Sequence, residues 1–280
     1  MMLESFVDYL KAQGKREDTA RVYARSIMRF MESDGNASDP EQFAKSYQLW
    51  FPQQGNSGAT QSLHKAAGQI YYYFLTGKKQ KFDFPASARK SNNPTPWLTP
   101  NQFDQLLGAM KELSSHKGKR AYLYRRNVTI IQTFVYTGLK VSQVAQLDVG
   151  DVDFKENCVM NGDLRIPMAP SLRDALRLWI DHRSDLRQLS AAARKRSPLF
   201  RSSAGKRMCR RTISLMIESY YLPGLKITPE ILRHTFAKWM LEATNNDTEL
   251  VSQLLGATYS PYLQPESRLD LAQMKELPLG

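Results

Sequence analysis

The stretch Asn157-Cys158-Val159-Met160-Asn161-Gly162-Asp163-Leu164-Arg165-Ile166-Pro167 decides the fold class of this chain. Its apolar and polar residues alternate as in half-buried strands, and Asn161-Gly162 favours a tight hairpin turn between them. With the β-branched run just before it, this stretch predicts short strands over 149–154, 157–160 and 164–167. Apolar residues on either side recur at helical spacing instead. We therefore expect a mainly α-helical fold that contains one small antiparallel β-sheet.

Helix-start and helix-stop signals flank the predicted sheet. Thr99-Pro100-Asn101-Gln102 combines a capping box with proline at the first helical position, which predicts helices over 100–113 and 119–137. The second helix is expected to end at Thr137-Gly138, where glycine supplies a left-handed cap. A short helix is predicted near 141–147, and the chain after the sheet is helical again. The order shows no βαβ alternation, no glycine-rich phosphate loop and no repeat.

Residues 85–96 (PASARKSNNPTP) are expected to form an extended linker. They hold three prolines and no apolar period, and each proline disfavours helix at the residue before it. The linker divides the chain into a helical N-terminal domain, 1–84, and a larger domain, 97–280. Four helices are predicted in the first domain, with Asp18 as one N-cap, Asp39 before Pro40 as another, and a helix over 58–75.

The charge balance points to a polyanionic partner. The 280 residues hold 39 Lys and Arg against 27 Asp and Glu, a formal charge of +12, with 42% apolar residues. That composition excludes a mostly disordered chain, a collagen and a coiled coil. Residues 165–211 hold 13 Lys or Arg against three Asp. Solvated helices usually mix charge signs, so this excess predicts an external anion such as nucleic acid.

The cysteines and the hydropathy pattern exclude several other classes. Cys158 and Cys209 are far apart and in no metal spacing, which fits a reducing compartment and argues against a disulfide framework. No run of 18 apolar residues and no signal-peptide pattern is present, so we expect no membrane span. A cytoplasmic, nucleoid-associated protein is predicted.

Several segments in order resemble the tyrosine recombinases, also called phage-type integrases. They are FVDYL (6–10) with TARVY (19–23), TGLKVSQV (137–144), IPM (166–168), PLF (198–200), TPEILRHTFA (228–237) and LLG (254–256). The resemblance implies a two-domain clamp on a duplex DNA half-site, made of a helical core-binding domain and a catalytic-type domain. It also implies chemistry without metal or cofactor, in which a tyrosine attacks a phosphate held by arginines and imidazoles.

The phosphate-binding positions depart from the family pattern. Lys140 stands where the first catalytic arginine is expected and lacks the planar fork that grips two phosphoryl oxygens. Glu230 replaces a histidine and would bring negative charge to the phosphate. Arg233 is kept, either to hold a phosphate or to serve Glu230. We expect Glu230 to form an ion pair with Arg233 or Lys140.

The acid and the nucleophile also depart from the pattern. The predicted hairpin holds no lysine, so the usual general acid is missing. Ala257 replaces the second imidazole, and the usual nucleophile position falls on Glu266. Tyr259 and Tyr262 are the only later tyrosines. We expect them to pack within the protein or to contact the DNA backbone rather than to act in catalysis.

We therefore expect sequence-specific duplex DNA binding by a catalytically degenerate tyrosine recombinase, acting as an accessory or regulatory factor in DNA recombination, integration or transcription. One alternative is an active recombinase that uses Tyr259 or Tyr262. Another is an interaction module for RNA or an acidic protein. The predicted DNA contacts are Arg25, Lys140, Arg165, Arg173, Arg201, Lys206, Arg207, Arg210, Arg211 and Arg233.

The C-terminal segment 266–280 is predicted to mediate assembly. Leu269, Leu271, Met274 and Leu277 give it an amphipathic pattern. In assemblies of the resembling family the C-terminal segment packs into a neighbouring subunit, so the resemblance implies a homo-oligomer on DNA. An active recombinase is a further expected partner.

Overall fold

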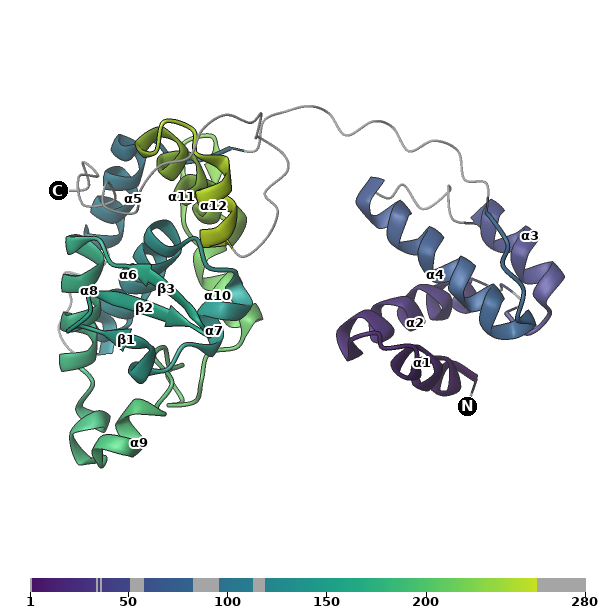
Figure 1. Ribbon diagram of the computed structural model, residues 1–280, viewed down its shortest axis with the longest axis horizontal. Helices are drawn as coiled ribbons and strands as arrows, with labels where there is room; N and C mark the ends of the chain where they lie inside the picture. The colour runs from purple at the N-terminus through teal and green to yellow at the C-terminus, as the bar shows by residue number, and fades with distance from the viewer. Residues whose placement is uncertain are drawn as a thin grey trace. The chain divides into compact units, whose positions relative to one another are not determined.

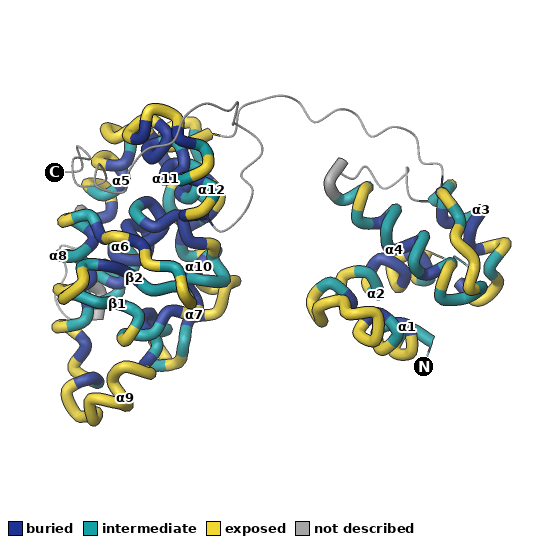
Figure 2. The backbone as a smooth tube through the Cα atoms, viewed as in Figure 1, coloured by how far each residue is buried: buried dark blue, intermediate teal, exposed yellow. Residues whose placement is uncertain are grey.

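The structure, a computed structural model, describes residues 2–33, 35, 37–50, 58–82, 96–112 and 119–255. The chain divides into two structural units, residues 1–93 and 94–280 (Figure 1). Each unit has its own buried core, as the dark blue segments of Figure 2 show. Residues 85–95 of the predicted linker lie outside the described residues.

The described part of unit 1–93 is helical, as the apolar spacing predicts. The Asp39 carboxylate accepts hydrogen bonds from the backbone N–H groups of Glu41 and Gln42, which confirms the predicted cap. The predicted cap at Asp18 is wrong, because the helix begins one residue earlier. Asp18 lies in its first turn, where a negative charge meets the positive end of the helix dipole. The helices are α1 (Met2–Ala12), α2 (Glu17–Glu32), α3 (Pro40–Trp50) and α4 (Gly58–Thr76).

Aromatic rings fill the core of this unit. Phe6 of α1 meets Tyr71 of α4 edge to face, with ring centroids 4.9 Å apart. Phe30 of α2 makes the same kind of contact with Phe43 of α3 at 5.5 Å. All four side chains are at most 1% exposed. Edge-to-face pairs add to the stabilisation from burial itself, so they help to fix α1 on α4 and α2 on α3.

A buried polar network joins α2, α3 and α4. The Ser26 hydroxyl lies 2.5 Å from His64 Nδ1 and 2.7 Å from the Tyr47 hydroxyl. Tyr47 in turn donates to the backbone carbonyl of His64 at 3.1 Å. Burial lowers the pKa of His64, and the charge of Arg29 acts in the same direction. The imidazole is therefore held neutral inside this unit.

The stability of unit 1–93 is expected to fall as the pH decreases through the range where histidine titrates. Because the pKa of His64 is lower in the folded chain than the ordinary value of about 6.5, the unfolded chain binds more protons there. The contribution is complete above about pH 6.5 and is lost below it. Hydrogen exchange of α2–α4 amides, corrected for intrinsic rates, should show weaker protection at about pH 5.5 than at about pH 7.5. His64→Gln should remove this difference, and an unchanged pH step in that variant would contradict the assignment.

Unit 94–280 begins as the capping signals predict. Thr99 Oγ1 accepts from the N–H of Gln102 at 3.3 Å, and Gln102 Oε1 accepts from the N–H of Thr99 at 2.9 Å, which confirms the capping box. Gly138 ends the second helix with φ +62° and donates to the Phe134 carbonyl at 2.9 Å. The first helices of the unit are α5 (Pro100–Glu112), α6 (Lys119–Thr137) and α7 (Val141–Gln146).

The predicted sheet is present with two changes. Residues 149–151 form a 3₁₀ turn, because Asp151 accepts from the N–H of Asp148 at 2.8 Å, so only two residues of the first predicted strand pair. Asn161 pairs with Leu164, so the tight turn lies at Gly162-Asp163 rather than Asn161-Gly162. Gly162 has φ +61° as its first residue, the position that a type II′ turn gives to glycine. The antiparallel order is β1 (Val152–Asp153), β2 (Cys158–Asn161) and β3 (Leu164–Pro167).

Helices follow the sheet, with one hairpin that the sequence analysis missed. Pro223-Gly224 joins two short strands, and Gly224 has φ +75°, as the third position of a type II turn requires. The remaining elements are α8 (Pro170–Asp181), η3 (Ser184–Gln188), α9 (Ala191–Lys195), α10 (Arg210–Glu218), β4 (Tyr221–Leu222), β5 (Leu225–Lys226), α11 (Pro229–Ala243) and α12 (Thr248–Leu255).

Helix α6 lies at the centre of this unit and packs against α8 and α11. Its residues Ile130, Ile131 and Phe134 are fully buried. The buried hydroxyls of Thr129 and Thr133 donate to the carbonyls four residues before them, at 2.8 and 2.7 Å. Both buried hydroxyls therefore have a hydrogen-bond acceptor, so neighbouring elements can cover α6 on several sides.

Candidate functional site

The end of α6, the start of α11 and the end of α12 meet at one guanidinium group. Arg233 Nη1 of α11 donates to the carbonyl of Gly138, and Nη2 donates to the carbonyl of Leu255 at 2.8 Å. These segments carry three of the family-like motifs, TGLKVSQV, TPEILRHTFA and LLG. Gly138 is more than 90 residues from Arg233 in the sequence and Leu255 more than 20, yet the fold brings these three motifs together around Arg233.

Lys140 lies beside this centre and is exposed. It stands at the N-cap of α7, where its N–H donates to the Gln143 side chain at 2.7 Å. Only Leu139 separates it from Gly138, whose carbonyl accepts from Arg233. Lys140 therefore belongs to the same short connection between α6 and α7 that Arg233 holds.

The ion pair expected for Glu230 is absent. Glu230 lies exposed in the first turn of α11, and among the described residues it forms no ion pair with Lys140 or Arg233. A carboxylate in this turn interacts favourably with the helix dipole without a cationic partner. Arg233 meanwhile directs two nitrogens to backbone carbonyls, which supply the acceptors that the sequence analysis assigned to Glu230.

His234 is half-buried next to Arg233. Burial lowers its pKa, while the Glu230 charge raises it and the Arg233 charge lowers it by smaller amounts. Its ring is therefore neutral at neutral pH.

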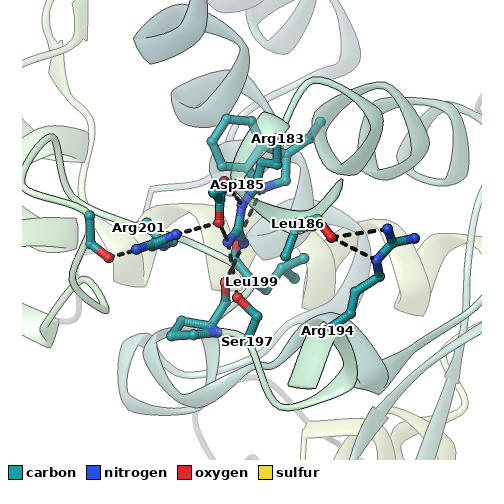
Figure 3. Close-up of polar contacts among 10 residues, drawn as sticks. Arg183, Asp185, Leu186, Arg194, Ser197, Leu199 and Arg201 are labelled. Carbon is teal, nitrogen blue, oxygen red and sulfur yellow. Dashed lines mark hydrogen bonds and ion pairs between the residues drawn. The ribbon is translucent and has the colours of Figure 1, made fainter. Parts of the chain in front are cut away.

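Some arginines of the basic stretch 165–211 form contacts within the fold. Arg183 is 1% exposed, and Figure 3 shows its guanidinium group surrounded by acceptors. It donates to the Asp185 carboxylate at 2.6 and 3.2 Å, to the carbonyls of Pro198 and Leu199 at 2.5 and 3.2 Å, and to Ser197 Oγ at 3.0 Å. The neighbouring arginines lower the pKa of Asp185, first of all through the Arg183 hydrogen bond.

Two arginines predicted to contact DNA are also held inside the unit. Arg201 binds the Asp185 carboxylate and the Gly205 carbonyl (Figure 3 shows the Asp185 contact). Arg207 binds the Asp148 carboxylate at 2.5 Å. It also donates to the last carbonyls of α7, those of Ala145, Gln146 and Leu147, at 2.8–3.1 Å. Internal acceptors thus take up charge that the sequence analysis assigned to an external anion.

The other predicted DNA-contact residues of this unit lie closer to solvent. Arg173 of α8 is half-buried, and Arg165 of β3, Lys206, Arg210 and Arg211 are exposed. Arg210 and Arg211 occupy the first turn of α10, where positive charge is disfavoured by the helix dipole. A phosphate at this position would relieve that repulsion. In the other unit, the side chain of Arg25 is exposed on α2.

Four further predictions fall outside the described residues. Ala257, Tyr259, Tyr262 and the segment 266–280 all follow Leu255, the last residue that the structure describes. The buried cluster around Arg183 was missed by the sequence analysis. Its acceptors come from residues up to 16 positions away, and no local spacing signals such contacts.

No described helix is long and apolar enough to cross a membrane. The described residues contain no group of three or more His, Cys, Asp or Glu side chains that could bind a metal ion.

The comparison with known proteins places most of the chain in one family. The sequence pattern of the phage integrase family matches residues 96–258. The tyrosine recombinase XerC of Pseudomonas aeruginosa PAO1 is 25% identical over 290 residues, which cover 97% of this chain and 91% of that protein. XerC of Roseiflexus sp. RS-1 is 29% identical over 271 residues, covering 91% and 77%.

Solved recombinase structures share the fold. The Tn1549 transposon integrase in complex with a circular intermediate DNA superposes with a TM-score of 0.68 at 17% identity, covering 98% of both chains. The XerH site-specific recombinase bound to its difH substrate gives a TM-score of 0.64 at 18% identity, covering 98% of this chain and 82% of that one. The chain belongs to the phage integrase family, the tyrosine recombinases.

Proposed function

We propose that this chain binds duplex DNA without cleaving it and acts as an accessory or regulatory member of the tyrosine recombinase family. The observation that carries the proposal is the contrast around Arg233. Exposed cations remain near Arg233, while Glu230 and Ala257 stand in the sequence where the family pattern has imidazoles. Two solved relatives of the same fold, the Tn1549 integrase and XerH, are bound to DNA.

The exposed cations support the binding half of the proposal. Helix α10 packs against α7, and Arg207 ties the segment before α10 to the end of α7. Lys140 begins α7, a helix about 9 Å long, so it belongs to the same neighbourhood as the Lys206–Arg211 segment. Together with Arg165 these side chains offer several positive charges to a phosphate backbone. Arg201 and Arg207 are left out of this contact set, because internal acceptors hold them.

The Arg233 centre supports the absence of cleavage. A phosphoryl transition state gains its stabilisation from positive donors that are already in position, and one such donor is worth about 10²–10³ in rate. Glu230 instead brings negative charge, and Lys140 lacks the bidentate fork of arginine. Two of the Arg233 nitrogens already donate to backbone carbonyls. The centre therefore lacks the preorganised positive charge that cleavage of a phosphodiester requires.

A two-part experiment tests the proposal. Gel-shift titrations over a range of salt concentrations should show duplex binding whose affinity falls steeply with salt. The triple variant Arg165→Ala/Lys206→Ala/Arg211→Ala should lower the salt slope by up to about 3, because each lost phosphate contact contributes about 0.9. In parallel, nicked suicide duplexes should trap no covalent adduct.

The matched control removes the same charge from the other unit. Lys11→Ala/Lys45→Ala/Lys78→Ala changes three exposed lysines, and it should change the slope by less than the first triple does. No duplex binding at low salt would refute the binding half. A covalent adduct that disappears in Tyr259→Phe or Tyr262→Phe would refute the loss of cleavage and restore the active-recombinase alternative.

In this proposal, the C-terminal segment 266–280 mediates assembly. Its apolar residues, Leu269, Leu271, Met274 and Leu277, would bind a second copy or an active recombinase on adjacent DNA. That arrangement would let a non-cleaving subunit influence strand exchange.

A further inference from the structure

A cavity of about 460 Å³ opens between α1 and α4 in unit 1–93, at a place that the proposed DNA contacts do not use. The two helices pack against each other (Figure 1). The turn after α1 and the segment after α4 complete the wall. The volume is in the range of small-molecule sites. The lining residues are Tyr9, Leu10, Gln13, Lys15, Gln69, Ile70, Tyr73, Lys79 and Gln80.

The cavity combines an apolar floor with aromatic walls. Leu10 is fully buried and Ile70 is half-buried, and both are aliphatic. Tyr9 of α1 is fixed by the Phe74 ring, with centroids 5.3 Å apart. Tyr73 of α4 is 39% exposed. A lining that combines two phenol rings with two aliphatic side chains suits a ligand with a flat ring.

The glutamine and lysine side chains of the cavity have no partner among the described residues. In the described part of the chain, the side chains of Gln13, Gln69 and Gln80 form no hydrogen bond. The side chains of Lys15 and Lys79 likewise form no ion pair there. In the basic stretch 165–211 of the other unit, by contrast, carbonyl and carboxylate groups accept hydrogen bonds from several arginines. Three amides and two ammonium groups are therefore available to a ligand.

The described lining carries positive charge only. It holds no aspartate or glutamate, while Lys15 and Lys79 contribute two positive charges. Both lysines come from segments that follow helices, whereas both tyrosines come from the helices themselves. A ligand that uses the whole cavity must carry an anionic group together with a flat ring that has hydrogen-bonding edges.

We propose that this cavity is a nucleotide-binding site. The base would stack on Tyr73 and Tyr9, the glutamine amides would bind its edge, and Lys15 with Lys79 would bind the phosphate. Stacking on an aromatic side chain next to a positive groove is how proteins hold single bases, and a planar side-chain amide can donate to and accept from a base edge. Free phosphate would leave the rings unused, and an apolar ligand would leave the ammonium groups unpaired.

Titration of the full chain with nucleoside 5′-monophosphates tests the proposal. Calorimetry or tyrosine fluorescence should show saturable binding, with inorganic phosphate binding more weakly. Tyr73→Ala should weaken nucleotide binding about tenfold or more, because it removes a stacking surface. Lys15→Ala/Lys79→Ala should weaken nucleotide binding and leave binding of the uncharged nucleoside unchanged. A short single-stranded oligonucleotide is titrated beside the mononucleotides, and the tighter binder identifies whether the base comes from a free nucleotide or a strand.

Controls on remote surfaces separate this site from general charge effects. Tyr221→Ala removes a tyrosine that is 75% exposed in the other unit, and Lys45→Ala/Lys155→Ala removes two exposed lysines outside the cavity. Both should bind nucleotide like the wild type. The proposal is overturned if neither nucleotide nor oligonucleotide binds at millimolar concentration. It is also overturned if the Tyr73 and lysine variants bind as tightly as these controls.

Discussion

Gly138→Ala is expected to destabilise unit 94–280 by about 2–5 kcal/mol. Residue 138 has φ +62°, and a non-glycine residue there costs roughly 1–2 kcal/mol. A Cβ atom at this position would also lie 2.2 Å from Cδ1 of Phe236, a buried ring, and 2.9 Å from a Leu255 methyl group. Forcing extra volume into a packed core typically costs a further 1–3 kcal/mol or so. Urea unfolding followed by tryptophan fluorescence measures this, because three of the four tryptophans lie in this unit.

Gly224→Ala, in the same unit, is the matched control. Its φ of +75° also lies in the left-handed region, but a Cβ atom there meets nothing within 4 Å. Only the backbone cost should remain, about 1–2 kcal/mol. An equal loss in the two variants would show that the contact with Phe236 contributes nothing, and a fully stable Gly138→Ala would refute the left-handed cap.

Arg183→Met is expected to cost about 3–5 kcal/mol, again in unit 94–280. Methionine fills much of the volume but donates no hydrogen bond. The carbonyls of Pro198 and Leu199 then lose a donor, and the Asp185 carboxylate loses one of its two arginine partners. Removing one partner of a buried charged pair lowers stability by this amount because the remaining groups stay desolvated. The measurement is again the urea midpoint, and the Trp179 ring beside the Leu199 carbonyl reports on it directly.

Arg196→Met provides the comparison for this prediction. Arg196 is exposed and its side chain forms no hydrogen bond or ion pair among the described residues. Its replacement should change stability by about 0.5 kcal/mol or less. If the two arginine variants unfold at the same urea concentration, the cluster in Figure 3 does not stabilise the fold.

Much of the fold could be predicted because its signals are local. The Thr99–Gln102 box, the Asp39 cap and the Gly138 terminus each involve residues within four positions of one another, and all three are confirmed. The hairpin turn was misplaced by one residue, because Asn161-Gly162 and Gly162-Asp163 both suit a two-residue loop and pairing across the strands decides between them.

The candidate site was less predictable because its contacts are long-range. Counting charge over 165–211 overestimated what an external anion must neutralise, since Arg183, Arg201 and Arg207 bind groups of the chain itself. The spacing of Glu230 and Arg233 suits an ion pair, yet Arg233 reaches carbonyls contributed by two other segments. No property of residues 228–237 alone reveals those acceptors.

The double attachment of Arg233 also bears on how such a protein evolves. A side chain that joins three segments of the chain through hydrogen bonds is selected because it stabilises the domain, independently of any reaction nearby. Purifying selection would then retain this arginine through a long decline of the chemistry around it. The presence of Arg233 in this chain is accounted for by its two backbone contacts and does not by itself indicate catalysis.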